Sequence, residues 1–380
     1  MFNLRDTVAV SMTYKAGIIG TGGVAGMGFI GTKGEQPTNE GVRSSHAGGY
    51  AATEDIDLVA VADIDEEKLD RFGDVWDIPD EQRYLGHEAM LEAEDLDVVS
   101  VCTPTFLHRG HVVDAARSAA DPDVIWCEKP IASSVSDADE MVAVCTETDT
   151  ELLINHIRRF DPTYHALRDR LVDDELLGDV RSMHAGFKRE LLRNGTHFVD
   201  MAAHLLDARP TAVSGFITAP EEATEQMGIE ADVDDAGGAG TILLEDGAVV
   251  TVDCTVSRDY WTGMFHLVGT DGKLYVNETD GECRFWRLED GVHVEADLGI
   301  DGERLNDLDA AFVEAASHVS DLLASGQGSH QSGEVKNRSS GEEGVEALEL
   351  LIALFVSDAV GGHVDLPFDG PLRGVEIRSW

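Results

Sequence analysis

The chain has 380 residues, of which 43% are hydrophobic and 27% are charged, so it is long enough for two domains that each bury a full core. Seventy-three acidic residues against 28 basic ones give a formal net charge of -45. A surface of that sign repels nucleic acids and anionic membranes, so we expect neither as a partner. No apolar run approaches the roughly 18 residues that span a bilayer, and the expected location is the cytoplasm.

The acidic residues are spread over the whole chain, and apolar periodicity persists between them. This pattern indicates a solvated acidic surface rather than a disordered tail. Only seven of the basic residues are lysines, and scarce lysine with abundant acid is typical of halophilic proteins. We therefore expect the acidic repulsion to be screened at high salt. Five cysteines without a C-x-x-C spacing argue against a disulfide framework or a zinc ribbon.

Residues 15–155 alternate between apolar strands and amphipathic helices, after an expected N-terminal extension over residues 1–14. Such alternation predicts an α/β domain with a parallel sheet and right-handed crossovers. The expected strands are at residues 16–19, 57–62, 98–102, 124–127 and 152–155. The expected helices are at residues 66–76, 108–119 and 136–146.

Residues 156–380 follow a different pattern, which predicts a second, α+β domain. After a helix near residues 162–172, strands are expected at residues 180–186, 212–217, 239–244, 248–255, 264–269, 273–276 and 283–288. The turn sequences between several of these strands favour antiparallel hairpins. Two late helices, at residues 307–323 and 342–357, flank a span rich in glycine and serine.

A glycine-rich turn follows the first predicted strand and contains Gly20, Gly22, Gly23, Val24 and Ala25. Glycine in such a turn lets a backbone approach a pyrophosphate at the start of a helix. Turns and helix caps also use glycine, so the motif depends on its context. The second predicted strand ends at Asp63, where a carboxylate would bind the adenosine ribose and repel a 2′-phosphate. We therefore expect NAD as the cofactor, with NADP less favoured.

The spacing within this motif is unusual. Asp63 lies 43 positions after Gly20, where about 20 is typical. The excess is a glycine-rich insertion, roughly residues 28–45, followed by a displaced helix at residues 46–50. The insertion either lines the site or forms a solvated loop, and we favour the loop.

Residues 124–130, with the sequence VIWCEKP, are an apolar strand closed by Glu128, Lys129 and Pro130. Open α/β sheets bind ligands at the carboxyl ends of their strands. An ammonium group that is half desolvated there exchanges its proton more readily. Lys129 is therefore a candidate catalytic residue, and a purely structural Glu-Lys pair is the alternative.

Two segments, VVSVCTPTFLH at residues 98–108 and CEKPIA at residues 127–132, complete an ordered set with the glycine turn. From residue 15 to about residue 368 the chain resembles the Gfo/Idh/MocA family of oxidoreductases. The resemblance implies an N-terminal Rossmann domain and a C-terminal domain with a large, mostly antiparallel sheet, whose open face commonly forms a homodimer or homotetramer. It also implies that Lys129 contacts nicotinamide ribose and substrate hydroxyl, and that the cofactor is lined by Thr103, Pro104, His108, Glu128 and Pro130.

Residues 194–200, NGTHFVD, are similar to the family's G-x-H-x-x-D motif, whose histidine is the general base. His197 suits that role because an imidazole can take a hydroxyl proton as hydride leaves the same carbon. Asp200, three residues further along the predicted helix, is expected to share the face of His197 and to steer it. A buried core histidine is the alternative.

Residues 155–161, NHIRRFD, resemble the family segment that carries substrate contacts, matched here by Ile157 and Arg158. Polyol-oxidising members have an aspartate four residues before the motif histidine, where this chain has Arg193. Arg193, Arg158 and Lys188 would favour a substrate with a carboxylate or another anionic group, although Arg193 could also pair with a surface acid. The other predicted substrate contacts are Asn194, His197 and Tyr260.

Together these features predict an NAD-dependent oxidoreductase that moves a hydride between nicotinamide and a secondary alcohol of a sugar, cyclitol or sugar acid. Lys129 would polarise the oxygen and His197 would handle its proton. Two alternatives are a redox-neutral enzyme, which oxidises a sugar transiently so that a glycosidic bond can be eliminated, and a non-catalytic sensor of nucleotide and sugar. No metal is expected, because His197 and His204 lack a third nitrogen or sulfur ligand at the necessary spacing.

Overall fold

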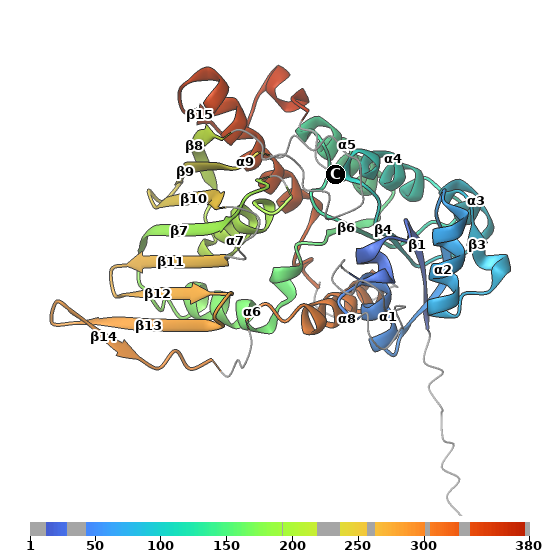
Figure 1. The fold of residues 1–380 in the computed structure, drawn as a ribbon, viewed down its shortest axis with the longest axis horizontal. Coiled ribbons are helices and arrows are strands. Elements are labelled where there is room, and N and C mark those ends of the chain that lie inside the picture. Colours follow the sequence, from blue (N-terminus) through green and yellow to red (C-terminus); the bar gives the residue numbers. More distant parts are fainter. Residues whose placement is uncertain are drawn as a thin grey trace, which may run out of the picture.

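The computed structural model describes residues 13–28, 43–191, 193–218, 236–256, 263–300, 305–326 and 335–376. Within these residues the chain forms two sheets side by side, a six-stranded sheet from the N-terminal part and a nine-stranded sheet from the C-terminal part (Figure 1). The predictions for residues 1–12, for most of the insertion after Gly28 and for Tyr260 lie outside the described residues.

The N-terminal sheet is parallel, with the strand order β3-β2-β1-β4-β5-β6. Its strands are β1 (Tyr14–Ile19), β2 (Ile56–Ala62), β3 (Arg83–Tyr84), β4 (Val98–Val101), β5 (Val124–Cys127) and β6 (Glu151–Ile154). Strands β4 and β5 are buried at every position, as a strand covered on both faces requires. The predicted parallel sheet is confirmed, and β3 is a two-residue edge strand that the sequence pattern did not indicate.

Helices pack on both faces of this sheet. One face contacts α3 (His87–Ala93), α4 (Thr105–Ala116) and α5 (Val135–Glu147). The other face contacts α1 (His46–Ala52), α2 (Glu66–Trp76) and α8 (Leu308–Gly326). Helix α8 comes from the C-terminal part of the chain and packs against α1, so the core of the N-terminal sheet includes residues far beyond position 155.

The first crossover of the N-terminal sheet is interrupted. After the glycine turn, η1 (Gly23–Met27) is a short turn that is interrupted at Gly26, whose backbone is not helical. Val24 is half-buried and Ala25 is buried. The helix predicted after the insertion is confirmed as α1. It begins after Ser45, whose side chain accepts the N–H of Gly48 at 3.0 Å, and such a cap satisfies one of the free donors of the first turn.

The C-terminal sheet has the order β14-β13-β12-β11-β7-β10-β9-β8-β15. Its strands are β7 (Val180–Lys188), β8 (Pro210–Ile217), β9 (Gly238–Leu244), β10 (Val249–Val256), β11 (Gly263–Gly269), β12 (Gly272–Asn277), β13 (Glu282–Glu289), β14 (Val292–Ala296) and β15 (Val364–Asp365). Neighbouring strands are antiparallel except β7 and β10, which pair in parallel. The mostly antiparallel sheet is thus confirmed, with edge strands β14 and β15 in addition.

One face of the C-terminal sheet is buried under helices α6 (Pro162–Arg168), α7 (Thr196–Leu206) and α9 (Gly341–Val360) (Figure 1). Phe265 and Val252 belong to this buried face. On the opposite face, alternate residues of the central strands are half-exposed. They form a shallow hollow lined by His184, Met264, His266, Lys273, Tyr275 and Trp286.

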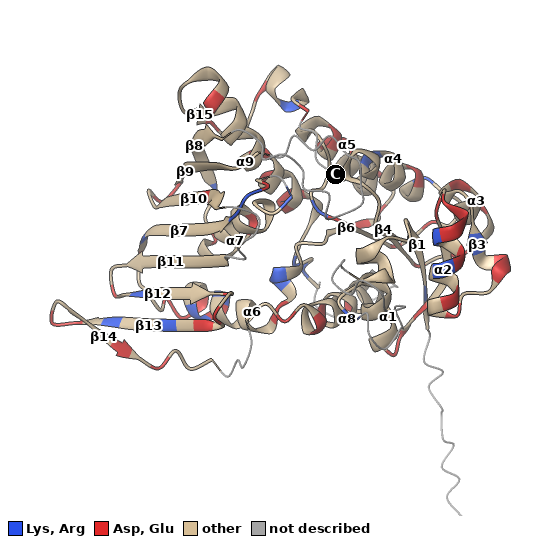
Figure 2. Ribbon diagram, in the orientation of Figure 1, with Lys and Arg blue, Asp and Glu red and all other residues tan. Residues whose placement is uncertain are grey.

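Figure 2 shows acidic positions on helices and loops of both halves of the molecule, as the composition indicates. Among the helices that the structure describes, none combines the length and the apolar character that a bilayer crossing requires.

Candidate active site

The residues predicted to bind a dinucleotide lie near the carboxyl ends of neighbouring strands of the N-terminal sheet. In the order of the strands, Asp63 follows β2, Gly20 follows β1, Thr103 follows β4, Lys129 follows β5 and Asn155 follows β6. Adjacent strands lie about 4.8 Å apart, so the row from β2 to β6 is about 19 Å long. A row of that length suits an extended ligand such as a dinucleotide, and it lies on the edge where open α/β sheets bind ligands.

The glycine turn after β1 has room for a ligand at Gly22. Gly20 has a φ of +90°, and a Cβ there would lie 2.8 Å from Thr103 Cγ2 and 2.9 Å from the carbonyl oxygen of Cys102. At Gly22, by contrast, a Cβ would meet no atom within 4 Å. The turn therefore requires glycine at its first position and leaves open space beside the backbone at its second. This arrangement fits the close approach of a pyrophosphate.

Asp63 fixes the glycine turn through Thr21. Its Oδ2 accepts the backbone N–H and the hydroxyl of Thr21, each at 2.8 Å, and its Oδ1 accepts the N–H of Asp65 at 3.0 Å. The next residue, Ile64, is 89% exposed. An exposed apolar side chain beside this strand end can support the flat face of an adenine ring. Thr21 and Ile64 were not among the predicted site residues, because neither belongs to the glycine-and-acid pattern.

His108 fastens together the two loops that flank the middle of the row. Its Nε2 lies 2.8 Å from the carbonyl oxygen of Thr103, and its Nδ1 lies 2.9 Å from that of Pro130. The ring is buried, and burial lowers the pKa of His108. Since both ring nitrogens contact the backbone, His108 holds these two loops together, and its predicted contact with a cofactor stays a prediction. Pro104 is exposed at the start of α4, and the Thr103 hydroxyl lies 3.0 Å from His111 Nδ1.

Lys129 and His197 come from the two halves of the chain to one place. Lys129 is half-buried and donates from Nζ to the carbonyl oxygen of Arg193 at 3.1 Å. Arg193 lies in the turn before α7, whose second residue is His197. Burial, followed by the positive charges of Arg158 and Lys129, lowers the pKa of His197 well below its usual value. The resulting neutral imidazole is the form that accepts a proton.

The expectation that Asp200 steers His197 is wrong. The buried Asp200 carboxylate accepts Nε of Arg159 at 3.0 Å and contacts Nη2 of the same arginine at 2.8 Å. It also lies 3.2 Å from His156 Nδ1. The spacing of three residues does not bring Asp200 to His197, because the carboxylate binds Arg159. Among the described residues, His197 Nδ1 is buried without a hydrogen-bond partner, and bound water or ligand commonly satisfies such an atom.

Arg158 does not offer the anion site that was expected. It is buried, and its guanidinium binds Glu278 at two points, with Nε–Oε1 at 2.7 Å and Nη2–Oε2 at 3.0 Å. Tyr164 donates its hydroxyl to the same Oε1 at 2.7 Å. The guanidinium carbon also lies 5.3 Å from the centre of the Phe198 ring. The prediction is therefore corrected: Arg158 belongs to a buried ion pair and influences His197 through space.

The remaining predicted substrate residues are Ile157, Arg193, Asn194 and Tyr260. Asn194 donates from its side-chain amide to Glu190 Oε2 at 2.7 Å. Arg193 Nη1 lies 3.9 Å from Glu190 Oε1, and about a third of the Arg193 side chain is exposed. Ile157 is buried. Tyr260 lies outside the described residues, so its predicted substrate contact stays a prediction.

Glu128, which was predicted to line the cofactor, is buried beneath the row. Its carboxylate lies 3.2 Å from His46 Nε2 and accepts a hydrogen bond from the Asn155 amide. Burial alone would raise the pKa of Glu128, but the hydrogen bond with His46, the charge of Lys129 and the bond from Asn155 outweigh it and hold the pKa below its usual value. Glu128 is therefore a buried carboxylate next to the candidate catalytic lysine.

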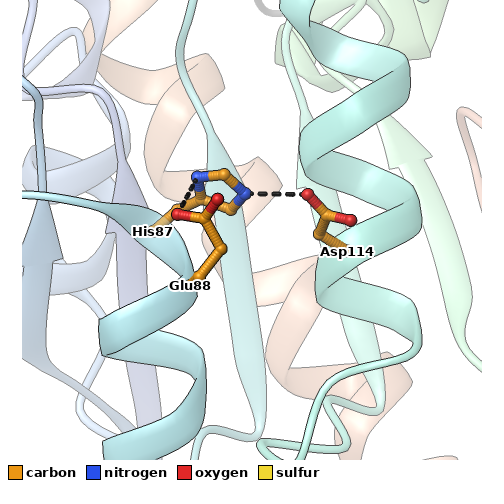
Figure 3. A group of neighbouring side chains, drawn as sticks. All are labelled: His87, Glu88 and Asp114. Atoms are coloured by element: carbon orange, nitrogen blue, oxygen red, sulfur yellow. Dashed lines mark hydrogen bonds and ion pairs between the residues drawn. The ribbon is translucent and has the colours of Figure 1, made fainter.

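One group in the described part of the chain has the spacing of a possible metal site. Figure 3 shows His87, Glu88 and Asp114, from helices α3 and α4. His87 Nε2 lies 2.9 Å from Asp114, and His87 Nδ1 lies 3.2 Å from Glu88. Because the carboxylates contact opposite nitrogens of one ring, they suit an imidazole held between two acids better than a shared ion, which binds one ring nitrogen. The absence of a metal site stays a prediction.

Comparison with known proteins identifies the class of this protein. A model of an oxidoreductase family with an NAD-binding Rossmann fold matches residues 15–156. A model of the GFO/IDH/MocA C-terminal domain matches residues 189–275. The two matches follow each other as the two sheets do, and the chain belongs to the Gfo/Idh/MocA family of oxidoreductases.

Individual relatives are similar at low identity. A D-apiose dehydrogenase of Paraburkholderia graminis is 31% identical over 241 residues, which cover 60% of this chain and 62% of the relative. An NADP(+) D-xylose 1-dehydrogenase of Haloarcula marismortui is 27% identical over 244 residues, which cover 57% of this chain and 63% of the relative. The similarity thus spans less than two thirds of the length of these two relatives.

A solved structure shows the same fold over nearly the whole chain. It is an oxidoreductase from Agrobacterium radiobacter in complex with NAD+, L-tartaric acid and magnesium, with a TM-score of 0.70. The superposition covers 93% of this chain and 98% of that chain at 20% sequence identity. At this identity the likeness concerns the fold alone.

Proposed function

We propose that the protein is an NAD-dependent dehydrogenase that transfers a hydride between nicotinamide and a secondary alcohol of a sugar, cyclitol or sugar acid. The main support is the position of Lys129, whose ammonium group lies 3.1 Å from the loop that leads into the helix of His197. Two similar proteins are named as dehydrogenases of apiose and xylose, which supports a sugar-like substrate.

The proposed reaction divides between these two side chains. Bound NAD would supply the hydride acceptor. When the alcohol is oxidised, its C–H bond breaks and the hydride, with both electrons, goes to the nicotinamide, while the hydroxyl proton goes to His197 as the C=O bond forms. The ammonium of Lys129 stabilises the oxygen as negative charge develops on it. The lowered pKa of His197 keeps its ring neutral at neutral pH, which is the form that can act as a base.

The proposed preference for NAD over NADP rests on Asp63. Its carboxylate lies at the end of β2 and is joined by the nearby acids Glu66 and Glu67 at the start of α2. A 2′-phosphate on the adenosine ribose would bring like charge against this group. One similar protein is named for NADP(+), so both nucleotides belong in any activity test.

The experiment that tests the proposed function is a screen of the purified protein with NAD and NADP in molar KCl. The alcohols would be sugars, cyclitols and their acids, and the signal would be the absorbance of the reduced nucleotide. A sugar acid is included because Arg193 replaces the aspartate of the polyol-oxidising pattern.

Formation of NADH with at least one alcohol supports the proposal. Tight NAD binding without reduction of NAD by any alcohol would contradict it and favour a sensor. Release of free sugar with NAD unchanged would favour the redox-neutral alternative.

We further propose that two copies of the chain pair through the half-exposed face of the C-terminal sheet. Its central hollow carries Met264, Tyr275 and Trp286, and large apolar and aromatic side chains are enriched at protein interfaces. Lys273 and Arg284 contact the Trp286 ring at 4.7 Å and 4.8 Å. Light scattering after size exclusion tests this, and a wild-type monomer at micromolar concentration would contradict it.

A further inference from the structure

A line of hydrogen-bonding side chains runs from the interior of the N-terminal sheet to Glu128. Tyr50 Oη lies 2.7 Å from Ser100 Oγ, Ser100 Oγ lies 2.9 Å from His46 Nδ1, and His46 Nε2 lies 3.2 Å from Glu128 Oε1. All four residues are buried. Helix α1 therefore contributes two residues, His46 and Tyr50, that lie beneath the proposed active site without touching the cofactor row.

One direction of donation satisfies every member of this line. Burial raises the pKa of Tyr50, so its hydroxyl stays protonated and donates to Ser100. Ser100 then donates to Nδ1 of His46, which leaves the proton of the ring on Nε2, where it donates to Glu128. Hydrogen bonds in such a line polarise one another and strengthen the last bond. Tyr50 and Ser100 thus select the tautomer of His46 that can bind a carboxylate.

Packing holds the His46 ring in this orientation. The ring lies over Trp126, with centroids 3.9 Å apart, and faces Phe312 of α8 at 5.8 Å. All three rings are buried. Because α8 closes this side of the sheet, His46 cannot turn its Nε2 to solvent.

Glu128 influences the charged groups around the proposed active site. Burial raises the pKa of the Cys102 and Cys127 thiols, and the charge of Glu128 adds to this rise. At His108 burial lowers the pKa, and the charge of Glu128 opposes that shift only in part. In turn, His46 and Lys129 favour the ionised form of Glu128. A protonated Glu128 would remove a buried negative charge that interacts with the Lys129 ammonium.

We infer that His46 is a positioning residue: it holds Glu128 as a carboxylate beside Lys129, so that the ammonium group stays charged and directed to the loop before His197. The kinetic part of this inference rests on the proposed function, whereas the charge of Glu128 can be measured without any turnover. An experiment can therefore disprove the kinetic role without disproving the effect of His46 on the charge of Glu128, and the reverse.

The first measurement is the titration of the Glu128 carboxyl carbon by 13C NMR in molar KCl, assigned by its loss in a Glu128→Gln variant. His46→Phe keeps the ring against Trp126 but removes both nitrogens, so the Glu128 titration should move up by roughly one to two pH units. Ser100→Ala, a smaller change that removes the donor to Nδ1, should move it in the same direction by less. His46→Gln retains an N–H donor, so the Glu128 titration in this variant should stay close to that of wild type.

The second measurement is the pH dependence of kcat. In His46→Phe the acidic limb of the pH profile of kcat should move to higher pH together with the Glu128 titration. In a Glu128→Gln background, His46→Phe should produce no further shift of this limb. The control is His318→Phe, which removes another buried histidine and should lower thermal stability without moving the limb. An unchanged Glu128 titration in both His46→Phe and Ser100→Ala overturns the inference, whether or not the protein is active. A shifted titration with an unmoved limb overturns the positioning role.

Discussion

Arg158 and Glu278, 120 positions apart, form a two-point ion pair with Nε–Oε1 at 2.7 Å and Nη2–Oε2 at 3.0 Å. Neither side chain is more than 4% exposed. The pair connects η4 (Ile157–Phe160), which follows the N-terminal sheet, to the end of β12 in the C-terminal sheet. It therefore ties the segment that carries Arg158 to the second sheet.

Removing one partner of this pair should be strongly destabilising. We expect Arg158→Met to lower the free energy of unfolding by about 3 to 5 kcal/mol, because Glu278 would remain buried and unpaired. The matched control is Arg109→Met, which also forms a two-point pair, with Glu140, but on an exposed surface, and whose loss should cost less than about 1 kcal/mol. Urea unfolding in molar KCl measures both. Equal losses for the two variants would show that the Arg158 pair contributes no more than a surface pair.

The local patterns of the sequence predicted the N-terminal sheet well. Buried strands such as β4 and β5 are continuous apolar runs, and the glycine turn and Asp63 follow directly from the strand ends. The displaced helix was also predicted, at residues 46–50, and the structure forms it as α1 with a cap at Ser45. The edge strands β3 and β15, each of two residues, are too short for any periodicity.

The partners of charged residues could not be predicted in the same way. Arg158 was expected to meet an anionic substrate, yet its partner Glu278 is far away in sequence. Asp200 was expected to share a helix face with His197, yet it binds Arg159. Both errors have one physical cause: a buried charge binds whichever opposite charge the tertiary fold brings close, and helical spacing does not identify that residue.

Asp63 should determine the choice of nucleotide. We expect Asp63→Ser to lower kcat/KM with NAD by about tenfold, because the ribose loses a charge-assisted hydrogen bond, and to raise kcat/KM with NADP relative to NAD. The control is Glu67→Ser, which removes one exposed acid of α2. Kinetics with both nucleotides at constant salt give the ratio. An unchanged ratio in Asp63→Ser would mean that the ribose lies elsewhere.

His318 should make the fold sensitive to acid. It is buried and accepts the backbone N–H of Arg338 at 3.1 Å, and burial with the Arg338 charge lowers its pKa to about 4. The unfolded value is near 6.5, so the unfolded chain binds the extra proton, and this stability is present above pH 6.5 and lost as the pH falls toward 4.

The neutral substitution His318→Gln removes that titration. Between pH 7 and pH 4.5, wild type should lose about 2 to 3 kcal/mol more unfolding free energy than the variant. Urea unfolding at the two pH values, at constant KCl concentration, gives the difference. The same pH dependence in both proteins would rule out a contribution from His318.

The acidic surface should make stability depend on salt. With a net charge of -45, repulsion among surface acids is strong at 0.1 M salt, where the Debye length is about 10 Å, and weak at 1 M, where it is about 3 Å. We expect Tm to rise between 0.1 M and 2 M KCl. Sucrose at matched osmolality is the control for exclusion of solutes, which also stabilises folded proteins. Full stability in dilute buffer would contradict a salt-adapted surface.

The most direct test of the proposed mechanism is the turnover of the Lys129→Ala variant, measured together with its dissociation constant for NAD. If the ammonium of Lys129 stabilises the reacting oxygen, kcat falls by about 10² to 10⁴ while NAD binding is largely kept. A kcat equal to that of wild type, with the same alcohol and nucleotide, would remove Lys129 from the reaction and contradict the proposed active site.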